Sequence, residues 1–179
     1  MKKISFLLVL IGLIATSSCK KDKIDPNEGE LITTFKVELT EKITRTKQSF
    51  EFKDLDGEGG NAPSKFDEII LAAGKSYECE LYLLNESVMP VDNITLEIAA
   101  EADDHQFYYT PSVTGLLITD LNKDTKGLPL GIKSIWTTGN AASGSVNISL
   151  KHKPGTKAAN DPISKGDTDI SLDFKVKVQ

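Results

Sequence analysis

The sequence predicts an all-β fold of the Ig-like sandwich type for residues 31–179, on three observations. From residue 31 onward, apolar and polar side chains alternate with period two, which is typical of half-buried antiparallel strands. Clusters of Gly, Pro, Asn and Asp interrupt the alternation at short intervals, as turns do in sandwiches. A folded body of about 150 residues also buries enough surface for a core without disulfides.

The clearest alternation lies at the two ends of this region. In the first segment, 31–40, Phe35 and Val37 share one face with their apolar neighbours two residues away. In the last, 169–178, Leu172 belongs to the apolar face and Asp169 to the polar face. Between these segments, further strands are expected at 48–53, 66–72, 76–84, 107–110, 113–119, 130–138 and 145–152.

One segment combines strand and helix signals. Ile94, Leu96 and Ile98 are two apart, as in a strand, but Ile94 and Ile98 are also four apart, and an Ala/Glu-rich stretch follows them. Alanine has the highest helix propensity. We therefore expect one short helix over 94–104.

Residues 1–18 predict a signal peptide. Lys2 and Lys3 precede an apolar run at 4–14, and small residues at 15–18 follow it. The run is shorter than the roughly 20 residues that a membrane-spanning helix needs, and it fits the apolar region of a secretory leader.

The ATSSC motif at 15–19 resembles the lipobox of bacterial lipoproteins. The resemblance implies that the leader is removed, and that Cys19 becomes the N-terminus and is acylated. Two or three acyl chains are needed for durable anchoring. Residues 19–30, which are polar and contain Pro26 and Gly29, are expected to form the lipidated N-terminus and a flexible tether. The alternative is an ordinary signal peptide that leaves Cys19 as a free thiol.

Cys79 is the other cysteine of the chain. It lies on the apolar face of the strand expected at 76–84, and no histidine is near it in sequence. Because a reactive thiol needs an electropositive environment, we expect Cys79 to be buried and unreactive.

Two loops carry oxygen ligands at alternate positions, as a bound Ca²⁺ requires. Their candidate ligands are Asp54, Asp56 and Glu58 in the first loop, and Asp120, Asn122 and Asp124 in the second. Neither loop is an EF-hand, because Lys65 and Gly131 occupy the twelfth positions, where a bidentate Glu is needed. In the alternative interpretation these residues only form turns.

Glu101, His105 and His152 form a second candidate metal site. On a helix, Glu101 and His105 would share one face, and His152 from a later strand would complete a site for Zn²⁺. The alternative is that both histidines are ordinary surface or hydrogen-bonded residues.

Composition and motifs exclude several function classes. The chain has 26 acidic and 21 basic residues, and the basic ones are scattered, which argues against a nucleic-acid partner. It has no Gly-rich phosphate loop, nucleophile elbow or HExxH motif. We therefore expect a non-enzymatic binding module, although a carboxylate pair for glycoside hydrolysis would not be visible in the sequence.

A second resemblance is carried by FKDLDG at 52–57, LNE at 84–86, ADDHQFYY at 102–109 and GLPLG at 127–131. These stretches look like those of small Bacteroidota lipoproteins that accompany TonB-dependent outer-membrane receptors. The resemblance implies a location at the outer membrane, with the periplasmic or surface face left open, and a capture role beside an outer-membrane receptor. Together with the candidate ligands named above, it predicts capture of a small ligand or of a metal ion such as Ca²⁺ or Zn²⁺. The alternative function is that of a structural or adhesive envelope module without a small ligand. The chain lacks the alternating βα pattern of a periplasmic binding protein, so the expected fold remains all-β.

Overall fold

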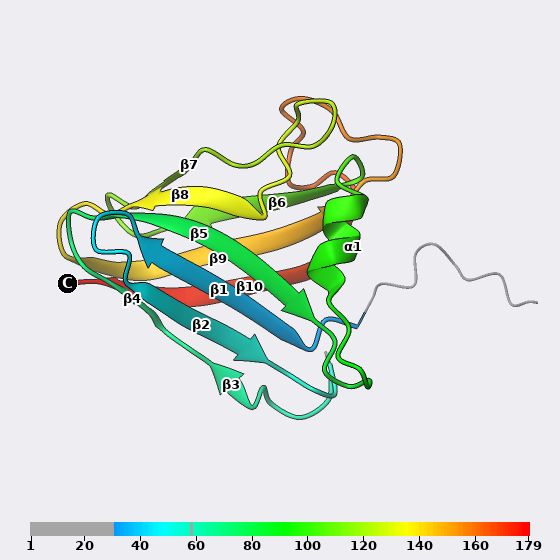
Figure 1. Ribbon diagram of the computed structural model, residues 1–179, viewed down its shortest axis with the longest axis horizontal. Helices are drawn as coiled ribbons and strands as arrows, with labels where there is room; N and C mark the ends of the chain where they lie inside the picture. Colours follow the sequence, from blue (N-terminus) through cyan, green and yellow to red (C-terminus); the bar gives the residue numbers. More distant parts are fainter. Residues whose placement is uncertain (1–30, 58) are drawn as a thin grey trace, which may run out of the picture.

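The strands form two sheets that pack face to face (Figure 1). The larger sheet has the order β3 (Lys65–Phe66), β2 (Lys47–Lys53), β1 (Thr34–Glu41), β5 (Ser76–Leu84), β8 (Lys133–Thr137) and β7 (Leu117–Thr119). The smaller sheet has the order β4 (Ile69–Leu71), β10 (Asp167–Val178), β9 (Ala142–His152) and β6 (His105–Pro111). Neighbouring strands are antiparallel except for β4 and β10, which are parallel. The all-β sandwich that the sequence predicts is confirmed.

This computed structural model describes residues 31–57 and 59–179. The predicted signal peptide at 1–18, the acylation site at Cys19, the tether at 19–30 and the candidate ligand Glu58 lie outside them. Within the described ranges, no helix has both the length and the apolar character needed to cross a membrane.

The core lies between the two sheets and follows from the alternation. Inward-facing side chains of β1, β5, β9 and β10 are almost completely buried, and Phe35 of the larger sheet lies 6.0 Å from Phe174 of the smaller sheet, measured between ring centroids. Trp136 and Tyr77 are the largest buried side chains. Cys79 is also buried, as predicted, and burial raises the pKa of its thiol to about 12.

The strand predictions fail where the chain passes from one sheet to the other. The segment predicted as one strand at 66–72 is divided into β3, which pairs with β2, and β4, which pairs with β10 in the other sheet. The segment predicted at 113–119 keeps only β7, because the chain leaves the smaller sheet after β6 and turns at Gly115, whose φ is +79°. Alternation cannot reveal such crossings, since the apolar residues stay buried in both sheets.

One helix, α1 (Ile94–Ala100), crosses the end of the sandwich (Figure 1). It buries Ile94 and Ile98, and Thr95 joins it to β5: the Thr95 hydroxyl accepts a hydrogen bond from the Leu83 N–H (2.7 Å) and donates one to the Leu83 carbonyl (3.2 Å).

The short helix is confirmed, but its predicted end at 104 is wrong. The turn that follows Ala100 is held by neighbouring loops: the Ala102 carbonyl accepts a hydrogen bond from Lys157 (2.7 Å), and Asp104 Oδ1 accepts one from the Gly155 N–H (2.9 Å). Acidic residues are also unfavourable at a helix C-terminus because of the helix dipole. The helix therefore ends with Glu101 as its C-cap.

The β1–β2 hairpin supplies a first testable prediction. The Glu41 carboxylate accepts hydrogen bonds from the backbone N–H groups of Thr44 and Ile43. A hydrogen bond with the Thr44 side chain, and then these backbone bonds, lower its pKa from 4.5 to about 2. A lowered carboxyl pKa stabilises the fold at pH values above 4.5, and this contribution is lost as the pH falls toward 2. Glu41→Gln should therefore lower the urea midpoint at pH 7. The difference from the wild type should disappear between pH 4.5 and 2, and a constant difference would contradict this account.

Candidate functional site

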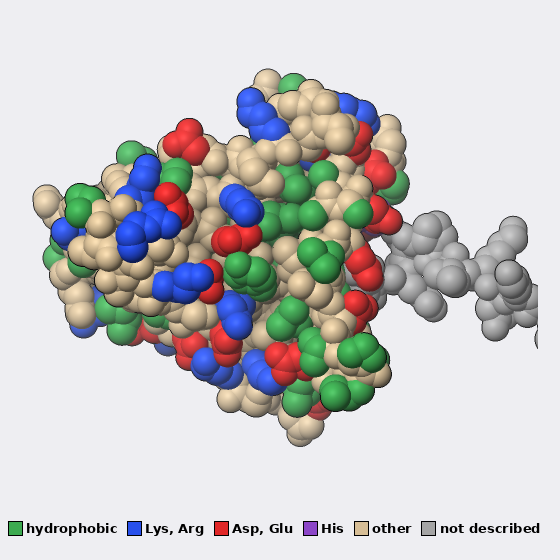
Figure 2. Space-filling model, viewed as in Figure 1, with side chains coloured by type: hydrophobic (Ala, Val, Ile, Leu, Met, Phe, Trp, Pro, Cys, Tyr) green, Lys and Arg blue, Asp and Glu red, His purple; other side chains and the backbone are tan. Residues whose placement is uncertain are grey.

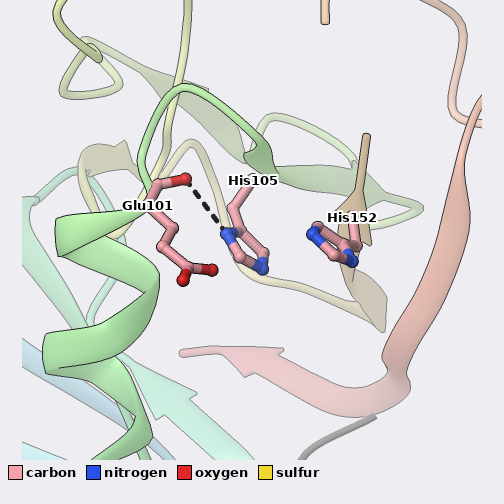
Figure 3. A group of neighbouring side chains, drawn as sticks. All are labelled: Glu101, His105 and His152. Carbon is pink, nitrogen blue, oxygen red and sulfur yellow. Dashed lines mark hydrogen bonds between the residues drawn. The ribbon is translucent and has the colours of Figure 1, made fainter. Parts of the chain in front are cut away.

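The two histidines of the described chain meet at one end of the smaller sheet. His105 is the first residue of β6, His152 is the last residue of β9, and the two are paired across the strands. Each continues the inward-facing row of its strand, two residues from Phe107 and from Leu150 respectively, so both point toward the interior below α1. Their rings are stacked, with centroids 4.6 Å apart and planes inclined by 9° (Figure 3).

Glu101 brings a carboxylate to the same place from the end of α1 (Figure 3). The candidate ligand atoms of Glu101, His105 and His152 all lie within 4.8 Å of one another. The helical route from Glu101 to His105 predicted from the sequence is wrong, because α1 ends before it. A turn leading into β6 achieves the same proximity.

The Glu101 backbone also determines which ring nitrogen of His105 can bind a metal ion. Its carbonyl oxygen lies 3.1 Å from His105 Nδ1. Because a carbonyl can only accept a hydrogen bond, Nδ1 carries the proton, and in the neutral ring the lone pair is on Nε2. Metal-binding histidines commonly have this arrangement, in which one nitrogen donates to a backbone carbonyl and the other faces the ion. His105 is itself buried, with 8% of its surface exposed.

Asp169 lies beside the site, next to His105, and the sequence did not reveal this position. Its Oδ2 lies 4.0 Å from His105 Nε2 and has no hydrogen-bond partner among the described residues, although the side chain is only 17% exposed. Burial raises the pKa of this carboxyl, and the nearby His105 and His152 oppose the rise only in part. The position results from an irregularity in the β9–β10 register between Thr168 and Ile170. Such a bulge turns aside a residue that strict alternation places on the outer face.

The two imidazoles and the Glu101 carboxylate form a donor set that suits Zn²⁺, and the Asp169 carboxylate lies beside it. Ligand atoms in a tetrahedral zinc site lie about 3.4 Å apart, given Zn–N bonds of about 2.1 Å. The donor atoms of Glu101, His105 and His152 now lie within 4.8 Å of one another, so these three side chains must approach somewhat, and one of the stacked rings must rotate, for both rings to face one ion. The set is too small and too rich in nitrogen for Ca²⁺, which takes 6–8 oxygen ligands.

The first acidic loop is a turn held by its own hydrogen bonds. Asp56 Oδ2 accepts hydrogen bonds from the backbone N–H (2.9 Å) and the side-chain amide (2.6 Å) of Asn61, and these bonds lower the pKa of Asp56. Asp54 is buried at the end of β2, and its N–H donates to the Thr33 carbonyl. The geometry of Asp56 therefore favours the turn interpretation over a calcium loop, whereas Asp54 Oδ1 is buried and has no hydrogen-bond partner among the described residues.

The second acidic loop also uses its side chains internally. Asn122 Oδ1 accepts a hydrogen bond from the Lys133 N–H (2.8 Å), and Asp124 Oδ1 accepts bonds from the N–H groups of Lys126 and Leu128. Although burial raises it, the pKa of Asp124 is below its ordinary value because Lys157 and Leu128 donate hydrogen bonds to the carboxylate. Asp120 is exposed and adopts a left-handed backbone conformation, with φ of 51°. These contacts again favour the turn interpretation.

The two acidic loops do not converge on one ion. The first follows β2 and the second follows β7, and three strands of the larger sheet lie between β2 and β7. Four inter-strand steps correspond to about 19 Å. The structure thus brings together Glu101, His105 and His152, and it keeps the acidic loops apart from each other.

Comparisons with protein families, with curated proteins and with solved structures found no match to this chain. The chemistry of the site therefore rests on its own geometry.

Proposed function

We propose that this protein is a lipid-anchored, non-enzymatic binding module of the outer membrane that captures a divalent transition-metal ion, with Zn²⁺ as the best fit. The observation that carries this proposal is the convergence of Glu101, His105 and His152 beside Asp169, a partly exposed carboxylate whose Oδ2 is buried and lacks a hydrogen-bond partner among the described residues. A bound cation would supply that missing partner. A buried carboxylate oxygen without a hydrogen bond is costly, which argues that the place of Asp169 in the fold has a use.

The sequence supports the proposed location of the protein at the outer membrane. The lipobox-like motif at 15–19 favours acylation of Cys19, and the resemblance to lipoproteins that accompany TonB-dependent receptors favours an uptake role with an outer-membrane receptor as partner. In this role the module holds the ion at the membrane and passes it to the receptor. Partial exposure of the site is compatible with such a transfer: Glu101 is exposed and His152 is partly exposed, whereas His105 is buried.

The test is zinc titration by calorimetry of the full chain, processed by a bacterial host, purified in detergent and stripped with a chelator. We expect one Zn²⁺ per chain, a higher melting temperature with zinc, and little response to Ca²⁺. Glu101→Gln should weaken zinc binding at least about tenfold, because it removes a charged ligand. The matched control is Glu97→Gln, which changes an exposed glutamate one turn earlier in α1 and should leave the affinity unchanged.

The opposite result would favour the alternative function. If zinc neither binds nor raises the melting temperature, or if Glu101→Gln and Glu97→Gln behave alike, the metal proposal fails. The internally bonded turns at Asp56 and Asp124 would then fit a structural or adhesive envelope module whose loops carry no ion.

A further inference from the structure

Exposed apolar side chains gather at the end of the sandwich where the described chain begins. Of the eleven large apolar side chains that are exposed among the described residues, five lie in the three segments of this end, so their placement is not scattered. They are Leu31, Leu55, Val88, Met89 and Val91, which we call the apolar tip, and Met89 is the most exposed of them at 89%. Figure 2 shows apolar side chains gathered at the lower right, over the loops that Figure 1 places after β2 and after β5.

Thr33 joins the segments of the apolar tip. Its carbonyl accepts a hydrogen bond from the Asp54 N–H (2.8 Å), and its hydroxyl accepts one from the Glu86 N–H (2.7 Å). Leu31 lies so close to Gly57 that a Cβ at Gly57 would come within 3.0 Å of the Leu31 side chain. The loop that carries Val88, Met89 and Val91 is closed by a bridge between Asn85 and Asp92. The tip is therefore one surface built on the ends of β1, β2 and β5.

The charged groups beside the tip are largely satisfied within the protein. Lys53 is paired with Glu86, and the Asp56 carboxylate is occupied by Asn61. Such a surface offers apolar contact rather than attraction to anionic groups. Contiguous exposed apolar patches of this kind mark contacts with proteins or with lipid.

The length of the chain between Cys19 and Leu31 favours lipid over a protein as the contact of the apolar tip. Eleven residues lie between Cys19 and Leu31, and the twelve steps along this chain span at most about 43 Å even when fully extended. Acylation of Cys19 thus keeps the end that carries Leu31 close to the bilayer. We infer that the apolar tip lies in the headgroup region of the bilayer and orients the domain on it. This inference rests on the lipid anchor of the proposed function and is independent of the metal site.

The experiment places a nitroxide label at either end of the domain in the full chain, acylated by its host and reconstituted into phosphatidylcholine vesicles. Met89→Cys labels the tip, and Ile43→Cys labels the β1–β2 hairpin at the opposite end of β1, where Ile43 is 83% exposed. Cys79 is buried and its pKa is raised to about 12, so it should not react. We expect the label at position 89 to be at least about fivefold less accessible to a water-soluble nickel chelate than the label at 43, and more accessible to oxygen, as for a buried interfacial side chain.

Several outcomes would overturn the inference. Equal accessibility at positions 43 and 89 would show that the tip is in water, and dipolar broadening between labels at 89 would show that a second copy covers it. Failure of the acylated chain to float with vesicles would remove both the anchor and the tip contact. Zinc affinity is measured on the same samples, and Met89→Cys should leave it unchanged. The experiment therefore distinguishes an absence of membrane contact at the tip from an absence of zinc binding.

Discussion

Lys157→Met is expected to lower the free energy of unfolding by about 3–5 kcal/mol, because it leaves one buried charge without its partner. Lys157 Nζ lies 2.8 Å from Asp124 Oδ2, and the two side chains are 1% and 0% exposed. The ammonium group also donates to the Ala102 carbonyl (2.7 Å), so one side chain joins the loop after β7 to the turn after α1. Methionine keeps much of the volume of the lysine stem and removes the charge. Urea denaturation at pH 7 measures the effect.

Two further variants separate the charge from the packing. In the double variant Asp124→Asn, Lys157→Met, the amide oxygen can still accept from Lys126 and Leu128, and no charge is left unpaired. We expect this double variant to be more stable than Lys157→Met alone. Arg45→Met breaks the pair with Glu78, whose side chains are 60% and 48% exposed, and should cost less than about 1 kcal/mol. Equal losses for Lys157→Met and Arg45→Met would refute the importance of the buried pair.

Asp169→Asn is expected to change stability and zinc affinity in opposite directions. In the absence of metal, the variant should be more stable by about 1 kcal/mol, because it removes a buried carboxylate oxygen that has no hydrogen-bond partner in the described chain. Its amide can also donate toward His105 Nε2, which Asp169 Oδ2 now faces at 4.0 Å. Zinc binding should weaken about 10–100-fold, as is usual when a carboxylate beside a metal ligand is lost.

Thermal melts of the metal-free chain and zinc calorimetry measure the two effects of Asp169→Asn. The neighbouring exposed substitution Asp173→Asn serves as the control, because Asp173 lies on the outer face of β10 and should affect neither quantity strongly. A metal-free variant that melts below the wild type would show that Asp169 stabilises the fold by itself. Unchanged zinc affinity would remove Asp169 from the site.

The sandwich was predictable because period-two alternation reports burial directly. The bounds predicted for β5, 76–84, agree with those observed, since inward and outward side chains alternate along the whole strand. The crossings between sheets were not predictable in this way, because residues such as Val113 and Leu116 are buried without belonging to a strand.

The candidate site was only partly predictable, for similar reasons. His105 and His152 continue the apolar rows of their strands, so their inward direction can be read from the sequence. Their pairing across β6 and β9 depends on the register, which alternation alone leaves open. The alternation places Asp169 on the outer face, because a bulge has no signature in it. For the acidic loops the sequence left two interpretations open, because calcium loops and plain turns use the same residue types.

The hydroxyl of Thr95 has a consequence for association between chains. β8 pairs with β5 only from Ser76 to Glu80, so the part of β5 near Leu83 would otherwise present a free N–H and a free carbonyl on that side. Open strand edges of this kind are templates for aggregation and domain swapping. The Thr95 hydroxyl forms hydrogen bonds with both the N–H and the carbonyl of Leu83. These two groups are therefore not available to pair with a strand of another chain.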